Sequence, residues 1–115
     1  MHRFISHTTT TSWGTVTYIM EEQGKAFARM YQYKEDNAVI YLDSLSVEES
    51  IRKQGVGTEL QEIRENIGKS IGATTSFLWV LKDSWMHEWY KKRGYEDYSD
   101  YEEDDMCIWM KKGLS

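Results

Sequence analysis

The sequence predicts an α+β fold in which two helices pack on one mixed β-sheet. Aromatic and β-branched residues fill strand-like runs in the first half of the chain, and the apolar period becomes helical after Gly57. Two more apolar runs of strand length follow, on either side of a second short helix. The predicted order is therefore β-β-β-α-β-α-β, an antiparallel meander followed by a β-α-β crossover, a second helix and a final strand. With 115 residues, we expect residues 1–115 to form a single domain.

Three strands are expected in the first half of the chain. Residues 12–20 (SWGTVTYIM) and 25–33 (KAFARMYQY) are strand-like, and the intervening EEQG favours a hairpin turn. Residues 38–47 (AVIYLDSLSV) are apolar almost throughout, which is typical of a central strand buried on both faces. The run HTTTTS at 7–12 is a poor helix former, and we expect a loop or a ragged edge there.

A helix is expected to begin in the glycine-rich segment that follows. Apolar residues recur there at helical spacing, and Gly72 is a suitable residue to end the helix. The apolar stripe consists of Val56, Leu60, Ile63, Ile67 and Ile71. The run SFLWVL at 76–81 has the length of a strand. Residues 83–92 form a second helix with two N-cap candidates at its start, and residues 106–111 form the last strand.

Charge and composition exclude several classes of function. The formal net charge of −5 argues against a protein dedicated to nucleic acid, and seven acidic residues gather at 96–105 (EDYSDYEEDD). No apolar run reaches the length of a membrane span, and the N-terminus lacks the apolar core of a signal peptide. The single cysteine fits a reducing compartment. We therefore expect a cytoplasmic protein without nucleic-acid or membrane partners, and we assign no metal ligands.

The segment SIRKQGVGTEL raises the main functional question. It carries Arg52, Gly55 and Gly57 in an R-x-x-G-x-G pattern between an apolar strand and a helix. The dinucleotide-binding pattern fails because Leu60 stands where its third glycine belongs, and a P-loop ending in GKS fails because Ile63 replaces a glycine. The remaining pattern fits two interpretations. It is a plain turn before a helix, or an anion site in which bare glycines let a phosphate approach the helix N-terminus.

A second motif, WYKKRGY at 89–95, favours the anion site. A strand, R-x-x-G-x-G, an amphipathic helix, a strand and a short helix ending in this motif together resemble the GNAT superfamily of N-acetyltransferases. That family carries [QR]-x-x-G-x-[GA] and, further along, aromatic-Tyr-x-x-x-Gly-aromatic. The second signature is supplied here by Trp89, Tyr90, Gly94 and Tyr95. The resemblance covers residues 38–95 and implies a GNAT-like fold with acetyl-CoA as the acetyl donor.

The resemblance implies a role for each matching residue. Backbone N–H groups from Arg52 to Thr58 would hold the pyrophosphate of coenzyme A, and the main chain at 45–47 would bind its pantetheine arm. Tyr90 would protonate the departing thiolate. Asp83 stands where many members place an asparagine that binds the cofactor arm, and it is equally a good helix cap. The cofactor-binding residues implied are Leu45, Ser46, Val47, Arg52, Lys53, Gln54, Gly55, Val56, Gly57, Thr58 and Asp83.

The motifs do not specify a general base. Some family members carry a glutamate on the strand before the second helix, but SFLWVL contains no acid. Asp43 is the first candidate, because strand alternation would place it on the same side as Leu45 and Val47. Binding a partner Lys or Arg is an equally good reason for its charge. Weaker candidates are Glu48, Glu49 and His87.

The identity of the acceptor is left open. Only about forty residues precede the strand at 38–47, too few for the family's usual first strand, two helices and two further strands. The helices that often wall the acceptor site are therefore missing or reduced, and an open groove or a second subunit of a homodimer would replace them. The acidic run at 96–105 would attract a cationic amine or a basic protein segment, or else is a solvated loop without a ligand.

The sequence thus predicts an acetyl-CoA-dependent N-acetyltransferase, in which a primary amine attacks the thioester directly in a ternary complex. The missing strand glutamate and the missing helices motivate a second interpretation. The chain would then be a non-catalytic acyl-CoA-binding or regulatory module of the same fold.

Overall fold

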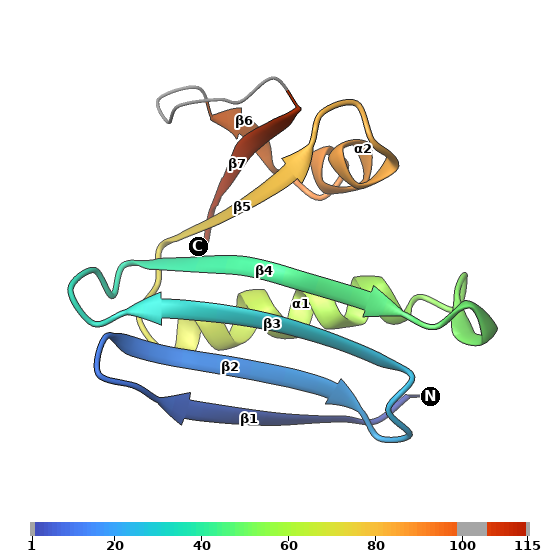
Figure 1. The fold of residues 1–115 in the computed structure, drawn as a ribbon, viewed down its shortest axis with the longest axis horizontal. Helices are drawn as coiled ribbons and strands as arrows, with labels where there is room; N and C mark the ends of the chain where they lie inside the picture. Colours follow the sequence, from blue (N-terminus) through green and yellow to red (C-terminus); the bar gives the residue numbers. More distant parts are fainter. Residues whose placement is uncertain (1, 99–105, 115) are drawn as a thin grey trace.

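A seven-stranded mixed sheet runs through the computed structural model, which describes residues 2–98 and 106–114 (Figure 1). The strand order is β1-β2-β3-β4-β5-β7-β6, and neighbours are antiparallel except for the parallel pair β4–β5. The predicted α+β fold with a mixed sheet is confirmed. The elements are β1 (Phe4–Thr10), β2 (Gly14–Glu21), β3 (Ala26–Tyr33), β4 (Val39–Val47), the 3₁₀ turn η1 (Glu49–Ile51), α1 (Val56–Ser70), β5 (Thr75–Leu81), α2 (Trp85–Lys91), β6 (Glu96–Tyr98) and β7 (Cys107–Gly113).

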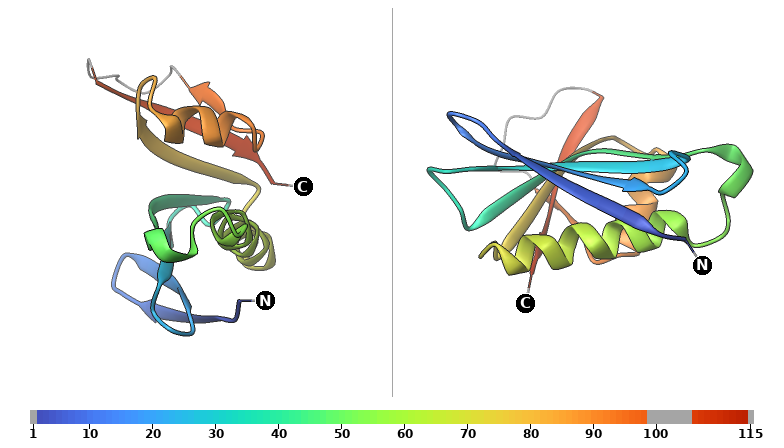
Figure 2. Two further views of the ribbon diagram at one scale, coloured as in Figure 1. Left: turned by 90° about the vertical axis from the view of Figure 1, so that its right-hand side faces the viewer. Right: turned by 90° about the horizontal axis from the view of Figure 1, so that it is seen from below.

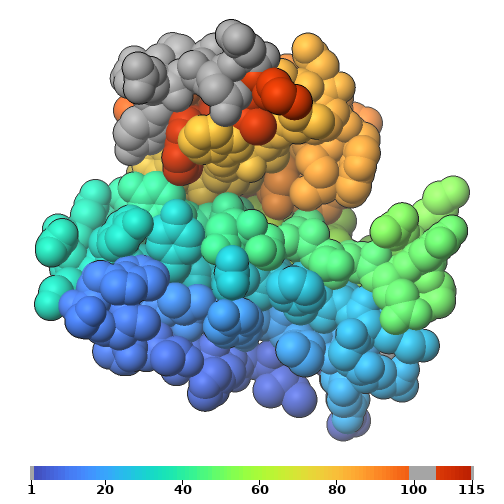
Figure 3. All heavy atoms as spheres, viewed as in Figure 1, coloured from blue at the N-terminus to red at the C-terminus, as the bar shows by residue number. Residues whose placement is uncertain are grey.

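Helix α1 covers one face of the sheet, and helix α2 stands beside β5. In Figure 2, α1 runs along one side of β2–β4, and it packs on these three strands. One hydrophobic core lies between α1 and β2–β3, and a second joins β4, β5 and β7 to α2. Within the described residues no helix covers the other face of β2–β4, which faces the viewer in Figure 3. The sheet therefore has one covered face and one open face.

Strands β4 and β5 separate halfway along their length. Their parallel pairing joins residues 39–42 of β4 to residues 75–78 of β5, and no pairing continues beyond these residues. Figure 1 shows the two strands diverging toward the C-terminal end of β4. Strand β5 stays paired with β7 along its whole length. The C-terminal half of β4, which includes residues 45–47, consequently has one edge without a neighbouring strand.

A β-bulge in β4 changes the direction of one predicted site residue. Met30 of β3 pairs with Leu42, but Arg29 pairs with Ser44, so Asp43 is an extra residue without a partner in the register. Leu42 and Leu45 both point to the α1 face, whereas the Asp43 carboxylate bonds Arg29 on the open face. The prediction that Asp43 shares a face with Leu45 is wrong, because the bulge interrupts the two-residue alternation.

The N-terminal segment is a strand where the sequence predicts a loop or ragged edge. Strand β1 contains residues 7–10 of the HTTTTS run and pairs with β2 over all seven of its residues. Threonine is β-branched and suits a strand, but this edge strand is exposed along most of its length and shows no apolar alternation. Within residues 2–98 and 106–114 no helix precedes η1.

The buried face of helix α1 includes Val56 and Leu60 of the predicted stripe but extends to one side of it. Ile63 and Ile67 are only half-buried, and Ile71 is 40 % exposed. Polar side chains take part of the buried face, and the buried positions are Val56, Leu60, Gln61, Arg64 and Gly68. The acidic run at 96–105 contributes β6 at its start, and its remainder lies outside the described residues.

Candidate functional site

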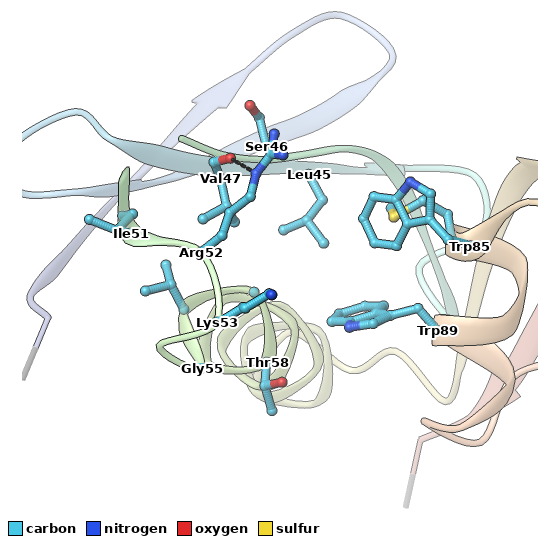
Figure 4. A pocket seen from close by; sticks show the side chains of 13 residues that line it. Leu45, Ser46, Val47, Ile51, Arg52, Lys53, Gly55, Thr58, Trp85 and Trp89 are labelled. Carbon is cyan, nitrogen blue, oxygen red and sulfur yellow. Dashed lines mark hydrogen bonds between the residues drawn. The ribbon is translucent and has the colours of Figure 1, made fainter. Parts of the chain in front are cut away.

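A cavity of about 470 Å³ opens where β4 and β5 part. Its walls come from the end of β4, the loop that follows η1, the first turn of α1 and one face of α2. Figure 4 shows the indoles of Trp85 and Trp89 on one side, Leu45 and Val47 on another, and the loop at Gly55 below. The lining residues are Leu45, Ser46, Val47, Ile51, Arg52, Lys53, Gly55, Val56, Gly57, Thr58, Trp85, Met86 and Trp89. Nine of these are cofactor-binding residues that the sequence predicts.

The loop before α1 presents backbone N–H groups to this cavity. Gly55 is the N-cap of α1 with φ 79°, and Lys53 two residues earlier is also left-handed, with φ 65°. Among the described residues no side chain caps this helix, whose first backbone bond runs from the Glu59 N–H to the Gly55 carbonyl. The N–H groups of the first turn lack intrahelical acceptors and lie at the positive end of the helix dipole. This geometry suits an anion.

Two basic side chains border the loop before α1. Arg52 and Lys53 are both exposed, so their charges lie at the mouth of the cavity. The Arg52 Nε donates to the Val47 carbonyl at 2.9 Å and ties the loop to the end of β4 (Figure 4). Arg52 therefore contributes both a positive charge and a fixed loop position.

The free edge of β4 adds backbone groups to the same cavity. The Glu48 N–H donates to the Lys25 carbonyl at 2.7 Å, so it points toward β3. Peptide groups alternate along a strand. Those of Leu45 and Val47 therefore point away from β3, toward the gap, while those of Ser46 point toward β3. The backbone groups of Leu45 and the Val47 N–H are thus the predicted main-chain groups available at this edge, because the Val47 carbonyl already accepts from Arg52.

The wall from α2 is aromatic, and the family resemblance assigned no cofactor-binding role to its two tryptophans. Trp85 and Trp89 are one helical turn apart, so their spacing could have signalled a shared face. Trp85 is 73 % exposed. The Arg93 guanidinium lies 3.6 Å from the ring centre of Trp89 and donates to Thr58 Oγ1 at 2.8 Å. Burial lowers the pKa of Arg93. This contact fixes the indole of Trp89 against the first turn of α1.

Tyr90 lies behind this wall rather than on it. Its side chain is 4 % exposed, does not line the cavity, and packs edge-on against Trp89 and Tyr95. Arg64 Nη2 donates to the Tyr90 hydroxyl oxygen at 3.0 Å. Among the described residues no acceptor takes the Tyr90 hydroxyl proton.

Three other predicted residues also lie outside the cavity lining. Asp43 is on the open face, where Arg29 Nε donates to both of its carboxylate oxygens at 2.9 and 3.0 Å. This pairing raises the pKa of Arg29. The Gln54 side chain accepts a hydrogen bond from His2. Asp83 is exposed, and it does not cap α2, because Ser84 is the N-cap and accepts from the His87 N–H.

The weaker base candidates also lie outside the cavity lining. His87 Nδ1 accepts the Asp83 N–H at 3.0 Å, so its Nε2 carries the proton that is donated to Asp97 at 2.7 Å. Both ring nitrogens are therefore engaged. Glu48 and Glu49 are exposed on the loop that follows β4.

Neither a metal centre nor a membrane-spanning helix is found in residues 2–98 and 106–114. No group of three or more His, Cys, Asp or Glu side chains there could hold a metal ion. None of the described helices is both long enough and apolar enough to cross a membrane.

Comparison with known proteins identifies the family. Residues 13–97, which are most of the chain, match the acetyltransferase (GNAT) domain family, and the protein belongs to this family. The cavity lies between the two signatures that carry the sequence resemblance. No match was found among curated proteins.

Solved structures share the whole architecture. A protein from Klebsiella pneumoniae assigned as an acyl-CoA N-acyltransferase has a TM-score of 0.78 at 14% identity, covering 100% of this chain and 99% of that one. An acetyltransferase from Bacillus cereus has a TM-score of 0.66 at 24% identity, covering 98% and 74%. The PaiA N-acetyltransferase from Thermoplasma acidophilum, solved in complex with coenzyme A, has a TM-score of 0.72 at 18% identity, covering 85% and 60%. At these identities the likeness concerns the fold.

Proposed function

We propose that this protein is an N-acetyltransferase that takes its acetyl group from acetyl-CoA and transfers it to a primary amine. One observation carries the proposal. The uncapped N-terminus of α1 and the free edge of β4 open into one cavity, so a single ligand with a phosphate end and an amide-rich arm would contact both. Membership of the GNAT family supports this choice of ligand.

The residues present fit coenzyme A. The N–H groups of Val56, Gly57 and Thr58 would hold the pyrophosphate, with the charges of Arg52 and Lys53 beside it. Backbone groups of Leu45 and Val47 would pair with the amides of the pantetheine arm, as an added strand does. Acetyl-CoA would supply an activated acetyl group as a thioester.

Tyr90 is the proposed proton donor to the leaving sulfur. Its oxygen accepts from Arg64, and its own proton has no acceptor among the described residues. A phenol is a suitable acid for a thiolate because the two groups have similar ordinary pKa values. In this assignment the Tyr90 side chain faces the apex of the split between β4 and β5.

Asp43 is the proposed general base, acting from the open face. An amine is protonated at neutral pH and must lose a proton before it attacks a carbonyl carbon. The Asp43 carboxylate is 30 % exposed and lies at the β4 bulge, one residue beyond the last β4–β5 pair. A cationic acceptor would approach from this uncovered face. A homodimer that walls the acceptor remains a prediction, for which sedimentation of the purified protein is the test.

Two observations favour the non-catalytic alternative. The Asp43 carboxylate is already held by the Arg29 guanidinium, and Tyr90 does not line the cavity. A module that binds acyl-CoA without transferring the acyl group would show both features.

The test measures free thiol released from acetyl-CoA in the presence of a panel of amines, diamines and peptides. The proposal expects release with at least one amine. In the Y90F variant we expect turnover to fall about a hundredfold with little change in acetyl-CoA affinity, since general acids typically contribute at least that factor. Y95F, which removes the hydroxyl of a similarly buried tyrosine that bonds Ser76 and not Arg64, is the matched control. Acetyl-CoA binding without release from any amine would establish the non-catalytic alternative.

A further inference from the structure

Arg64 is a completely buried cation in the middle of α1. It is 0 % exposed, and the acceptors of its four hydrogen bonds are all uncharged. No carboxylate contacts its guanidinium among the described residues. Burying a charge without a counter-ion costs several kcal/mol even after relaxation. An arginine at this position therefore requires a reason beyond packing.

The first reason is the β4 bulge. Arg64 Nη1 donates to the Ser44 carbonyl at 2.9 Å and to the Arg29 carbonyl at 3.2 Å. Ser44 and Arg29 face each other where the register shifts. The bulge lies one residue beyond Leu42, the last residue of β4 that pairs with β5. Arg64 thus holds the backbone at the apex of the split.

The second reason is Tyr90. The other terminal nitrogen, Nη2, donates to the Tyr90 oxygen at 3.0 Å and to Gln61 Oε1 at 2.6 Å. One planar group therefore joins the Tyr90 hydroxyl to the bulge carbonyls and sets where that hydroxyl lies relative to the apex. Because the Tyr90 oxygen accepts from Arg64, its proton is directed elsewhere.

The charge on Arg64 is only indirectly compensated. The Gln61 side chain, which accepts from Arg64, donates in turn to the Glu65 carboxylate. That carboxylate also pairs with Lys112 Nζ at 2.8 Å. A positive charge without a direct counter-ion among the described residues therefore lies 3.0 Å from the Tyr90 oxygen. This is the sign that stabilises the phenolate left behind when a phenol gives up its proton in a site that excludes water.

We propose that Arg64 is a positioning residue for acetyl transfer, which holds the Tyr90 hydroxyl at the apex of the β4–β5 split and stabilises it after proton donation. The inference rests on the proposed function. It assigns a role to a residue that touches neither the cavity nor, in our proposal, the substrates.

The test compares R64K, Y90F and the R64K/Y90F double variant with the wild-type protein. The amine is the fastest acceptor from the thiol-release panel. We expect R64K to lower kcat tenfold or more, with the KM for acetyl-CoA and its thermal shift nearly unchanged. In the Y90F background the same substitution should have no further effect on kcat, because Arg64 acts through Tyr90.

S76A is the matched control for disturbing the buried network. Ser76 is 0 % exposed and bonds the Tyr95 hydroxyl at 2.8 Å, so its removal leaves a comparable buried gap without touching Arg64. We expect S76A to lower stability but to keep kcat. R64Q, which keeps an N–H donor without the charge, is the second variant if R64K does not fold.

A readout without turnover separates this inference from the proposed function. Protein labelled with 3-fluorotyrosine gives a ¹⁹F resonance for Tyr90 that is identified by its loss in Y90F. The resonance should move in R64K or R64Q and stay in S76A. An unmoved resonance, an unchanged kcat in R64K, or equal effects of R64K with and without Tyr90 would overturn the role of Arg64. Absence of turnover in the wild type would instead overturn the proposed function.

Discussion

Replacing Gly57 with alanine should separate stability from ligand binding. Gly57 is the second residue of α1 and lines the cavity. A Cβ built there would lie 3.6 Å from Trp89 Cζ2 and 3.9 Å from Val47 Cγ2, which are ordinary van der Waals distances. The free protein therefore has room for the methyl group, which would project between the two walls of the cavity.

The two expected effects have opposite signs. Alanine is favoured over glycine in a helix by up to about 1 kcal/mol, and less in the first turn, so G57A should melt at the wild-type temperature or up to about 4 °C higher. The same methyl keeps a phosphate from the helix N–H groups. Losing one charge-assisted hydrogen bond costs about 1.5–3 kcal/mol, which corresponds to roughly a 10–100-fold weaker Kd for acetyl-CoA.

Isothermal titration calorimetry and thermal melting of the same samples provide the assay. G113A is the matched control, because a Cβ at Gly113 meets nothing within 4 Å and the residue is outside the cavity. We expect G113A to bind as the wild type does. A G57A variant that binds acetyl-CoA within about twofold of the wild type would refute the assignment of this loop as the phosphate site.

Three further predictions concern stability and the base. G68A should lower the free energy of unfolding in urea by about 1–2 kcal/mol, because the alanine Cβ would lie 2.6 Å from Ile40 Cδ1. The double variant G68A/I40V should lose less stability, since valine lacks that Cδ1 atom. Backbone N–H groups, first that of Gln23, bond the Glu21 carboxylate and lower its pKa. The ionised carboxylate therefore stabilises the fold above pH 4.5, and this stabilisation is lost as the pH falls through the lowered pKa. The difference in unfolding free energy between wild type and E21Q should accordingly shrink from about pH 7 to about pH 3. D43N should cost less than about 1 kcal/mol, because the pair with Arg29 is partly exposed, yet slow amine acetylation strongly; unchanged turnover would exclude Asp43 as the base.

Much of the fold follows from local patterns that the sequence displays. The strand runs, the period of α1 and the turn before Val56 all depend on near neighbours, and the observed bounds of these elements differ by a few residues at most. Strand β1 was missed because an edge strand needs no buried stripe. Its identity comes from pairing with β2, which is a tertiary property.

The cofactor side of the candidate site was predictable because it depends mainly on backbone. Glycines at fixed spacing before a helix specify a bare, uncapped N-terminus, and the structure places Gly55 and Gly57 on the cavity wall. Side-chain contributions from Trp85 and Trp89 depend on how α2 packs, which the two motifs do not encode.

The direction of the Asp43 side chain and the burial of Arg64 were not predictable, because both depend on tertiary contacts. Alternation assigns faces only while the register is regular, and the bulge at Asp43 depends on pairing with β3. A charged residue on an amphipathic helix is normally assigned to the solvent face. Arg64 reverses that expectation because the bulge carbonyls and Tyr90 supply its acceptors in the core.

The location of acetyl-CoA binding is the central claim, and amide chemical-shift mapping tests it most directly. ¹H–¹⁵N spectra of the labelled protein would be recorded during titration with acetyl-CoA. We predict the largest shifts at Leu45, Val47, Val56, Gly57 and Thr58. Saturable shifts confined to the open face of the sheet, or no shifts at millimolar acetyl-CoA, would contradict the account.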